Sequence, residues 1–265
     1  MKFLSKFYVA IIYLFLYLPI AVLIVFSFND TKSRTVFNGF TLKWYEKLFT
    51  NDVILSALFN TLLVAVVAGV FAVILGTFAA IGINAMNSLL KSILLNVSYL
   101  PIINPDIITG VSLMLLFLFL KVKLGYTTLI LAHITFNVPI VIFNVLPKLR
   151  QMDKNVYNAA LDLGCNPGQA FKKVVLPEIM PGIAAGFLLS VTYSFDDFVV
   201  SYFTSGPTSQ TLSVVIYSMV RLKVSPEINA LSTIMFAVVL FILLLVNVIE
   251  VKKEKYETKM MEGEN

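Results

Sequence analysis

The sequence predicts an all-α polytopic membrane protein with six transmembrane helices. Of its 265 residues, 58% are hydrophobic and only 13% are charged, and the mean hydropathy is +0.89. A soluble domain of this length cannot bury so much apolar surface, so a lipid bilayer must replace water around much of the chain. Strand-like alternation of apolar and polar residues is absent, which argues against an outer-membrane barrel.

Six apolar stretches are long enough to span a bilayer, because a helix needs roughly 20 apolar residues to cross about 30 Å of hydrocarbon. The predicted spans are residues 7–28, 56–82, 93–120, 127–147, 181–203 and 229–249, and none contains Lys or Arg. The first resembles a signal peptide, but its apolar run is longer than the usual signal core and no small-residue cleavage site follows it. We therefore expect it to be retained, within a single transmembrane domain over residues 1–265.

The distribution of basic residues predicts the orientation, since Lys and Arg are enriched in cytoplasmic loops. With a cytoplasmic N-terminus, the inside set is Lys2, Lys6, Lys91, Lys148, Arg150, Lys154, Lys172, Lys173, Lys252, Lys253, Lys255 and Lys259. The outside set is Lys32, Arg34, Lys43, Lys47, Lys121, Lys123, Arg221 and Lys223. Both termini are then cytoplasmic, and the net charge of +5 reflects topology rather than nucleic-acid binding.

The chain offers little reactive chemistry. Cys165 is the only cysteine, which excludes an internal disulfide, and His133 is the only histidine. His133 lies in the fourth predicted span, where a packed, hydrogen-bonded role is expected more often than a ligand role. No phosphate-binding loop and no nucleophile–base pair are present. We therefore expect no enzymatic activity, no cofactor and no bound metal.

The cytoplasmic loop 148–180 is predicted to begin with a capped amphipathic helix. Asp153 can cap a helix that runs to about Leu163, and Gly164 then supplies the left-handed residue that often ends a helix. Three residues recur on one face of this helix: Val156, Ala160 and Leu163.

A second short helix is predicted directly after this stop. Asn166 can cap it, Pro167 occupies its first position, and Gln169 stands where a capping-box partner belongs. We expect this helix to end before Pro177. The two helices form an elbow, residues 153–177, and an elbow with two capped arms indicates a docking surface for another protein rather than a linker.

The elbow sequence NAALDLGCNPGQAFKKVVLP resembles the "EAA" loop of ATP-binding-cassette (ABC) importer permeases. Five residues fall on the positions of that pattern: Ala159, Ala160, Gly164, Leu176 and Pro177. Asn158 stands where the family usually has Glu, so a salt bridge from this position to the ATPase is in doubt. The resemblance implies the fold of a type I importer permease, with the elbow coupling it to the ATPase.

Further segments are similar to the second permease subunit of spermidine/putrescine transporters. They are GFTLKWYEKLF (39–49), LPIINPDIITGVSLMLLF (100–117), SFDDFVVSYFTSGP (194–207) and TLSVVIYSMVRLKVSPEINAL (211–231). This resemblance implies a complex with a second permease, two copies of a cytoplasmic ATPase and an extracytoplasmic substrate-binding protein. The substrate is then a polyamine, and ATP is hydrolysed by another chain.

The third span is predicted to be interrupted near the middle of the membrane, because Pro101, Asn104 and Pro105 precede Asp106. At about 1.5 Å per residue from Lys91, Asp106 would lie roughly 22 Å into the bilayer. The fourth span carries Asn137 and Pro139 at a similar depth.

The charged residues inside the predicted spans are all acidic: Asp106, Asp196 and Asp197. Acidic side chains alone favour a cation over phosphate or sulfate, so these three are the candidate substrate-pathway residues. Adjacent residues on a helix point about 100° apart, so one of Asp196 and Asp197 is enough to face the path.

Other functions remain open on these residues. Fe³⁺ would satisfy the charge argument as well as a polyamine, and the same machinery also serves other solutes, such as phosphonates. An ion-coupled secondary transporter is less favoured, because the elbow has no role there and no inverted repeat is visible. A membrane-embedded enzyme is disfavoured by the absence of catalytic groups.

Overall fold

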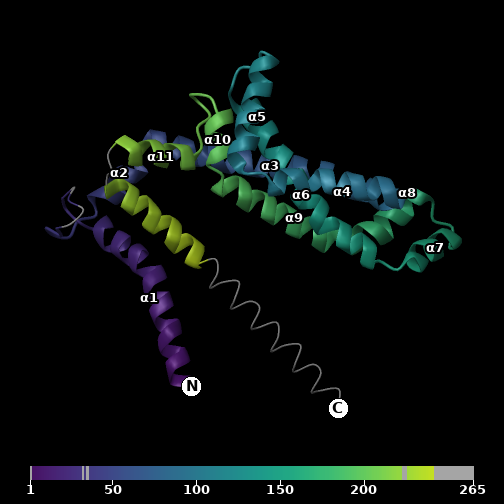
Figure 1. Ribbon diagram of the computed structural model, residues 1–265, viewed down its shortest axis with the longest axis horizontal. Coiled ribbons are helices and arrows are strands. Elements are labelled where there is room, and N and C mark those ends of the chain that lie inside the picture. Colours follow the sequence, from purple (N-terminus) through teal and green to yellow (C-terminus); the bar gives the residue numbers. More distant parts are fainter. Residues whose placement is uncertain (1, 32, 34–35, 223–225, 242–265) are drawn as a thin grey trace. The chain divides into compact units, whose positions relative to one another are not determined.

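The computed structural model describes residues 2–31, 33, 36–222 and 226–241 (Figure 1). In chain order the helices are α1 (Lys2–Ser27), α2 (Lys43–Phe49), α3 (Asp52–Ala85), α4 (Ser88–Ile103), α5 (Asp106–Phe119), α6 (Tyr126–Gln151), α7 (Lys154–Asp162), α8 (Pro167–Ala170), a π-helical turn (Phe171–Val175), α9 (Leu176–Asp196), α10 (Val199–Thr204), α11 (Leu212–Leu222) and an apolar helix over Pro226–Phe241. Within the described ranges the only extended pairing is one bridge between Asn29 and Phe40. The predicted all-α class is confirmed.

The chain forms two compact units. One contains the described residues up to Asp52 together with those from Ile216 onward, and the other contains Val53–Val215. The second unit holds the elbow and all three candidate acidic residues, so it is the unit in which the functional site is found.

Four helices are long and apolar enough to cross a membrane, over Lys6–Ser27, Asp52–Ala85, Tyr126–Gln151 and Pro167–Asp196. The bent pair formed by α4 and α5 supplies a fifth candidate. The sixth predicted span, 229–249, starts within the apolar helix Pro226–Phe241, and its last eight residues lie outside the described ranges.

The third predicted span is broken, as its prolines suggested. Asn104 and Pro105 are extended, with ψ angles of 139° and 134°, and α5 leaves α4 at an angle of 101°. The count of roughly 22 Å to Asp106 assumed one straight helix from Lys91, whereas α4 ends at Ile103, so the depth of Asp106 stays a prediction.

The two faces of α3 differ in the size of their apolar residues rather than in polarity. Its buried face carries small side chains such as Ala65, Ala68 and Ala72, while Phe71 and Phe78 are exposed. In a membrane the hydrophobic effect does not drive helices together, because lipid is as apolar as the side chains, so helices associate by close packing of small residues. The large apolar residues then face the lipid.

Val141 on α6 lies between two glycines of different helices. A Cβ on Gly76 of α3 would stand 2.6 Å from Val141 Cβ, and a Cβ on Gly186 of α9 would stand 3.2 Å from Val141 Cα. One turn earlier on α9, a Cβ on Gly182 would come within 2.6 Å of the Asn144 backbone oxygen. Helices α3, α6 and α9 therefore pack as one tight group, and α6 and α9 run side by side in Figure 1.

In the other unit, the loop between α1 and α2 is organised around Asn29. The Asn29 side chain donates to the Val36 oxygen at 2.9 Å and accepts from the Asn38 N–H at 2.9 Å. Trp44 of α2 donates its indole N–H to the Asn29 oxygen at 2.7 Å and is only 5% exposed. The Trp44 ring is therefore packed, and its polar atom is bonded inside the loop.

Candidate functional site

The first arm of the elbow is α7, and both of its ends are stabilised by local hydrogen bonds. Asp153 accepts from the Asn155 N–H at 2.9 Å at the start of the helix. At its end, the N–H of Cys165 bonds to the Ala160 oxygen at 3.0 Å, and Gly164 has a φ of +88°. This is a Schellman motif, which needs a residue in the left-handed conformation that glycine adopts without strain.

The second arm begins with the predicted capping box. Asn166 accepts from the Gln169 N–H at 2.9 Å, and Gln169 accepts from the Asn166 N–H at 3.1 Å. The predicted end before Pro177 is wrong, because the helix continues through it to Asp196. A π-helical turn, in which the Leu176 N–H bonds to the Phe171 oxygen, precedes the proline and accommodates its missing donor.

The elbow is fixed to the α3–α6–α9 group by apolar side chains. Val175 is buried, and Tyr157 and Phe171 pack against the same core cluster that contains Val141 and Ile179. The elbow and the two long helices α6 and α9 therefore form one packed region.

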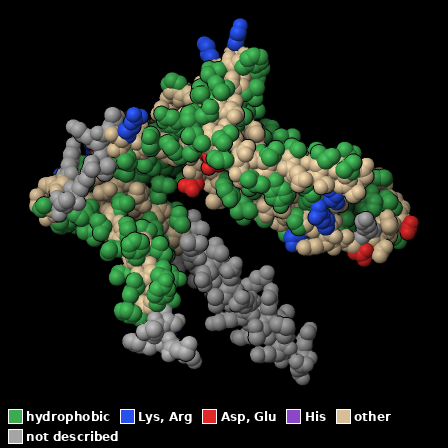
Figure 2. All heavy atoms as spheres, viewed as in Figure 1, with side chains coloured by type: hydrophobic (Ala, Val, Ile, Leu, Met, Phe, Trp, Pro, Cys, Tyr) green, Lys and Arg blue, Asp and Glu red, His purple; other side chains and the backbone are tan. Residues whose placement is uncertain are grey.

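The outer face of the elbow is exposed. Leu163 is 87% exposed and Val156 is 52% exposed, which is unusual for apolar residues of an amphipathic helix. Among the predicted coupling residues, four are exposed, and these are Asn158, Ala159, Gly164 and Pro177. Ala160 and Leu176 are half-buried. Figure 2 shows charged side chains gathered around this end, whereas hydrophobic ones predominate along α4.

The acidic residues lie at the far end of α9 from the elbow. Helix α9 contains 21 residues and is therefore about 30 Å long, the thickness of the hydrocarbon layer. Asp196 is exposed in its last turn, and Asp197 follows it as a residue whose side chain is only 9% exposed. The adjacent pair is thus divided into one exposed and one largely buried carboxylate.

Asp106 reaches the same region through the packing of α5 on α10. It is exposed in the first turn of α5, one turn before Gly110. A Cβ on Gly110 would stand 3.3 Å from Val200 Cα, and Val200 lies four residues after Asp196. The break between α4 and α5 and the break between α9 and α10 therefore meet near one another.

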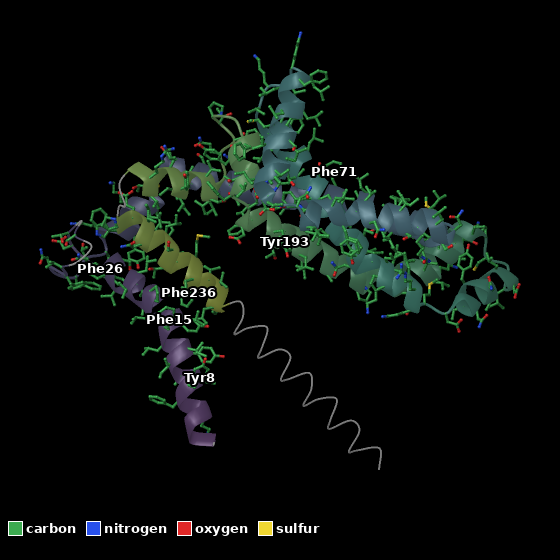
Figure 3. All side chains as sticks on the ribbon, viewed as in Figure 1. Tyr8, Phe15, Phe26, Phe71, Tyr193 and Phe236 are labelled. Atoms are coloured by element: carbon green, nitrogen blue, oxygen red, sulfur yellow. The ribbon has the colours of Figure 1, made fainter. Side chains whose placement is uncertain are left out.

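Two residues of this region were missed by sequence reasoning as members of the site. Tyr193, which Figure 3 labels on α9, is 59% exposed and three residues before Asp196, so both share one helix face. His133, expected to be a packed residue, is fully buried at 3.1 Å from Ser201 Oγ and 3.6 Å from Asp197 Oδ2. Tyr193 could have been identified from its spacing of three residues from Asp196. No local sequence pattern links His133 to α10.

Groups of three or more His, Cys, Asp or Glu able to hold a metal ion do not occur among the described residues. The arrangement consists of an exposed apolar elbow at one end of a tight helix pair and exposed carboxylates at the other end. It offers contacts for a partner protein and for a cation.

The sequence profile of the family described as "Binding-protein-dependent transport system inner membrane component" matches residues 72–251. The chain is 39% identical over 247 residues to the "Spermidine/putrescine transport system permease protein PotC" of Escherichia coli K12, covering 93% of this chain and 94% of that protein. It is 38% identical over 240 residues to the "Putrescine transport system permease protein PotI" of the same strain, covering 85% and 83%.

The fold is also similar to chains of solved transporters. One belongs to a bacterial ABC transporter involved in the import of the acidic polysaccharide alginate, with a TM-score of 0.72 at 19% identity and 94% of both chains covered. At this identity the likeness concerns the fold alone. The match over residues 72–251 and the full-length relatives show that the chain belongs to the family of binding-protein-dependent transport system inner membrane components, and it is therefore a multi-pass transport subunit of a bacterial inner membrane rather than an enzyme.

Proposed function

We propose that this chain is one of two permease subunits of an ABC importer and that it forms part of the pathway for polyamines such as spermidine and putrescine. Its relatives PotC and PotI are named as permease proteins of spermidine/putrescine and putrescine transport systems. In the complete importer the chain joins a second permease, two copies of a cytoplasmic ABC ATPase and an extracytoplasmic substrate-binding protein. Both of its termini and the elbow lie on the cytoplasmic side.

The exposure of Asp106 and Asp196 is the single observation that carries the substrate class. An ionised carboxylate facing lipid costs at least about 2.5 kcal/mol, so each must face a water-filled path or a partner chain. Asp196 stands in the last turn of α9, where the helix dipole disfavours negative charge, so its position does not serve helix stability. The exposed ring of Tyr193 beside it can hold an ammonium group by a cation–π contact.

The elbow supplies the connection to ATP hydrolysis. Its exposed apolar residues dock on the ATPase, and closure of the ATPase pair moves the elbow. Because α9 is continuous from the elbow to Asp196 and packs tightly on α6, this movement reaches the acidic end as a rigid displacement of both helices. The path then opens alternately to the two sides of the membrane.

The proposal is tested by uptake of radiolabelled spermidine and putrescine into vesicles that contain the whole importer. Asp106→Asn and Asp196→Asn remove one charge each and should raise the KM for spermidine about tenfold, the value of a lost hydrogen bond to a charged group. Asp52→Asn is the matched control, since Asp52 is also an exposed carboxylate in the first turn of a helix. It should leave the KM unchanged.

Two results would contradict the proposal in different ways. Parental kinetics in both path variants would mean that the carboxylates are structural. Uptake of ⁵⁵Fe³⁺ but not of polyamines by the parental importer would keep the acidic path and reject the polyamine.

A further inference from the structure

Asp197 is bound by the elements that surround it. Its carboxylate accepts the N–H of Val200 at 3.2 Å and the N–H of Ser201 at 2.7 Å, which are free donors in the first turn of α10. Its backbone oxygen accepts from Ser213 Oγ at 2.7 Å. The residue therefore caps α10 and fixes the start of α11 at the same time.

Helix α6 contributes a buried polar pair to this point. His133 Nε2 lies 3.1 Å from Ser201 Oγ and 3.6 Å from Asp197 Oδ2, and the imidazole is fully buried. One turn later, Asn137 donates to Ser194 Oγ at 2.7 Å in the last turns of α9. Polar bonds from one face of α6 thus reach both sides of the break between α9 and α10.

The end of α10 is attached to the same helix. Thr128 of α6 donates its hydroxyl to the Thr204 oxygen at 2.8 Å. A six-residue helix has almost no stability of its own, so its direction is set by these bonds.

Asp196 differs from its neighbour in each of these respects. Asp196 is exposed and is the last residue of α9. A negative charge at a helix C-terminus is electrostatically unfavourable. Asp197 stands where a carboxylate is favourable, at a helix N-terminus with its bonds made.

We propose that Asp197, His133 and Ser201 are positioning residues, which hold the break between α9 and α10 so that Asp196 is the carboxylate presented to the solute. This inference rests on the proposed pathway, because it assigns the two adjacent acids to different tasks. It predicts that the hydrogen bonds to α10 matter at position 197 and that the charge offered to the solute matters at position 196.

Replacement by alanine and by asparagine separates the two tasks in the purified importer. Asn keeps one acceptor oxygen where the carboxylate uses two, so Asp197→Asn should retain one of the two cap bonds, accelerate the hydrogen exchange of the α10 amides less than Asp197→Ala does, and keep part of the spermidine uptake. Asp197→Ala loses the cap and should accelerate this exchange about tenfold while lowering the maximal uptake rate. Asp196→Asn should raise the KM for spermidine and leave the exchange of α10 unchanged.

Ser201→Ala, which removes the hydroxyl that contacts His133, should accelerate exchange in α10 by a few-fold. Thr135→Ala is its control, because the Thr135 hydroxyl bonds only to the Leu131 oxygen of its own helix and should leave α10 unaffected. The inference is overturned if Asp197→Asn impairs uptake as much as Asp197→Ala does, or if Asp197→Ala leaves the exchange of α10 unaltered.

The exchange measurement also keeps this inference separate from the proposed function. If Asp106→Asn and Asp196→Asn both transport normally, the acidic path is rejected. Faster hydrogen exchange of the α10 amides in Asp197→Ala would still establish that Asp197 caps α10. The claim that this cap presents Asp196 to a solute would be overturned together with the path.

Discussion

At the scale of single residues, the face of α9 that meets α6 carries small side chains at every fourth position. They are Gly182, Gly186, Ser190 and Ser194, and all four are buried. The two glycines lie toward the elbow and allow close backbone contact, whereas Ser194, toward the acidic end, accepts a hydrogen bond from Asn137. One helix pair thus changes from apolar contact to polar contact along its length.

This spacing is visible in the sequence, but it does not identify α6 as the partner of α9. Repeated small residues four positions apart indicate a helix contact in membranes, but they do not say which helix is the partner. The partner depends on contacts far apart in the chain, such as that of Gly186 with Val141, which no local pattern contains.

Gly76→Ala should destabilise the subunit, because its new Cβ would stand 2.6 Å from Val141 Cβ. Overpacking of this kind costs about 1–3 kcal/mol and outweighs the gain of about 1 kcal/mol that alanine brings to a helix. Gly82→Ala on the same helix is the matched control, because nothing lies within 4 Å of its Cβ, and it should be neutral or stabilising. Thermal unfolding of the purified importer measures both, and equal midpoints would contradict the close contact at Val141.

At the scale of elements, the elbow was the part of the fold that the sequence predicted best. Its caps are local, so Asp153, Gly164 and the Asn166–Gln169 pair could be identified from residues no more than three positions apart. The continuation through Pro177 could not, because the preference of the preceding residue against helix is weaker than the support that neighbouring helices give.

Gly164→Leu should weaken docking of the ATPase, because a branched side chain is strained at a φ of +88° and the turn after α7 would change direction. Gly164→Asn is the control, since Asn tolerates this conformation and should keep most of the coupling. Ala160→Asp should weaken docking without backbone strain. The measurement is the ATPase activity stimulated by the loaded binding protein, together with uptake.

Normal coupling in Gly164→Leu and Ala160→Asp would remove the elbow from the transport mechanism. A loss that is equal in Gly164→Asn and Gly164→Leu would point to the missing glycine itself rather than to strain.

At the scale of the whole molecule, composition was enough to predict a helical membrane protein, and run length was enough to place five of the six predicted spans on described helices. Composition does not show where a helix changes direction. The 101° break between α4 and α5 and the short α10 after Asp197 arise from proline, extended residues and long-range bonds. The prolines predicted the first of these breaks, whereas the break after Asp197 depends on bonds to α6 and could not be predicted.

The proposed orientation predicts which positions face each side of the membrane. Cys165, the only native cysteine, lies in the elbow and should react with membrane-impermeant maleimide only from the cytoplasmic side. In a Cys165→Ser background, Lys43→Cys should react from outside and Glu262→Cys from inside, although Glu262 lies outside the described residues. Labelling of Glu262→Cys from outside would reject the six-span topology and the location of the elbow.

The polar bonds that join α6 to α9 and to α10 also impose an order in time. His133 and Ser201 are 68 residues apart, and Asn137 and Ser194 are 57 apart. At roughly 5–20 residues per second, the ribosome makes Ser201 about 3–14 seconds after His133. Helix α6 therefore leaves the ribosome before the partners of its polar side chains exist. Because an unsatisfied polar group in hydrocarbon costs several kcal/mol, α6 must remain in a protein or aqueous environment until then. The apolar 18-residue window of the first span has no buried residue, so its side chains have no such delay.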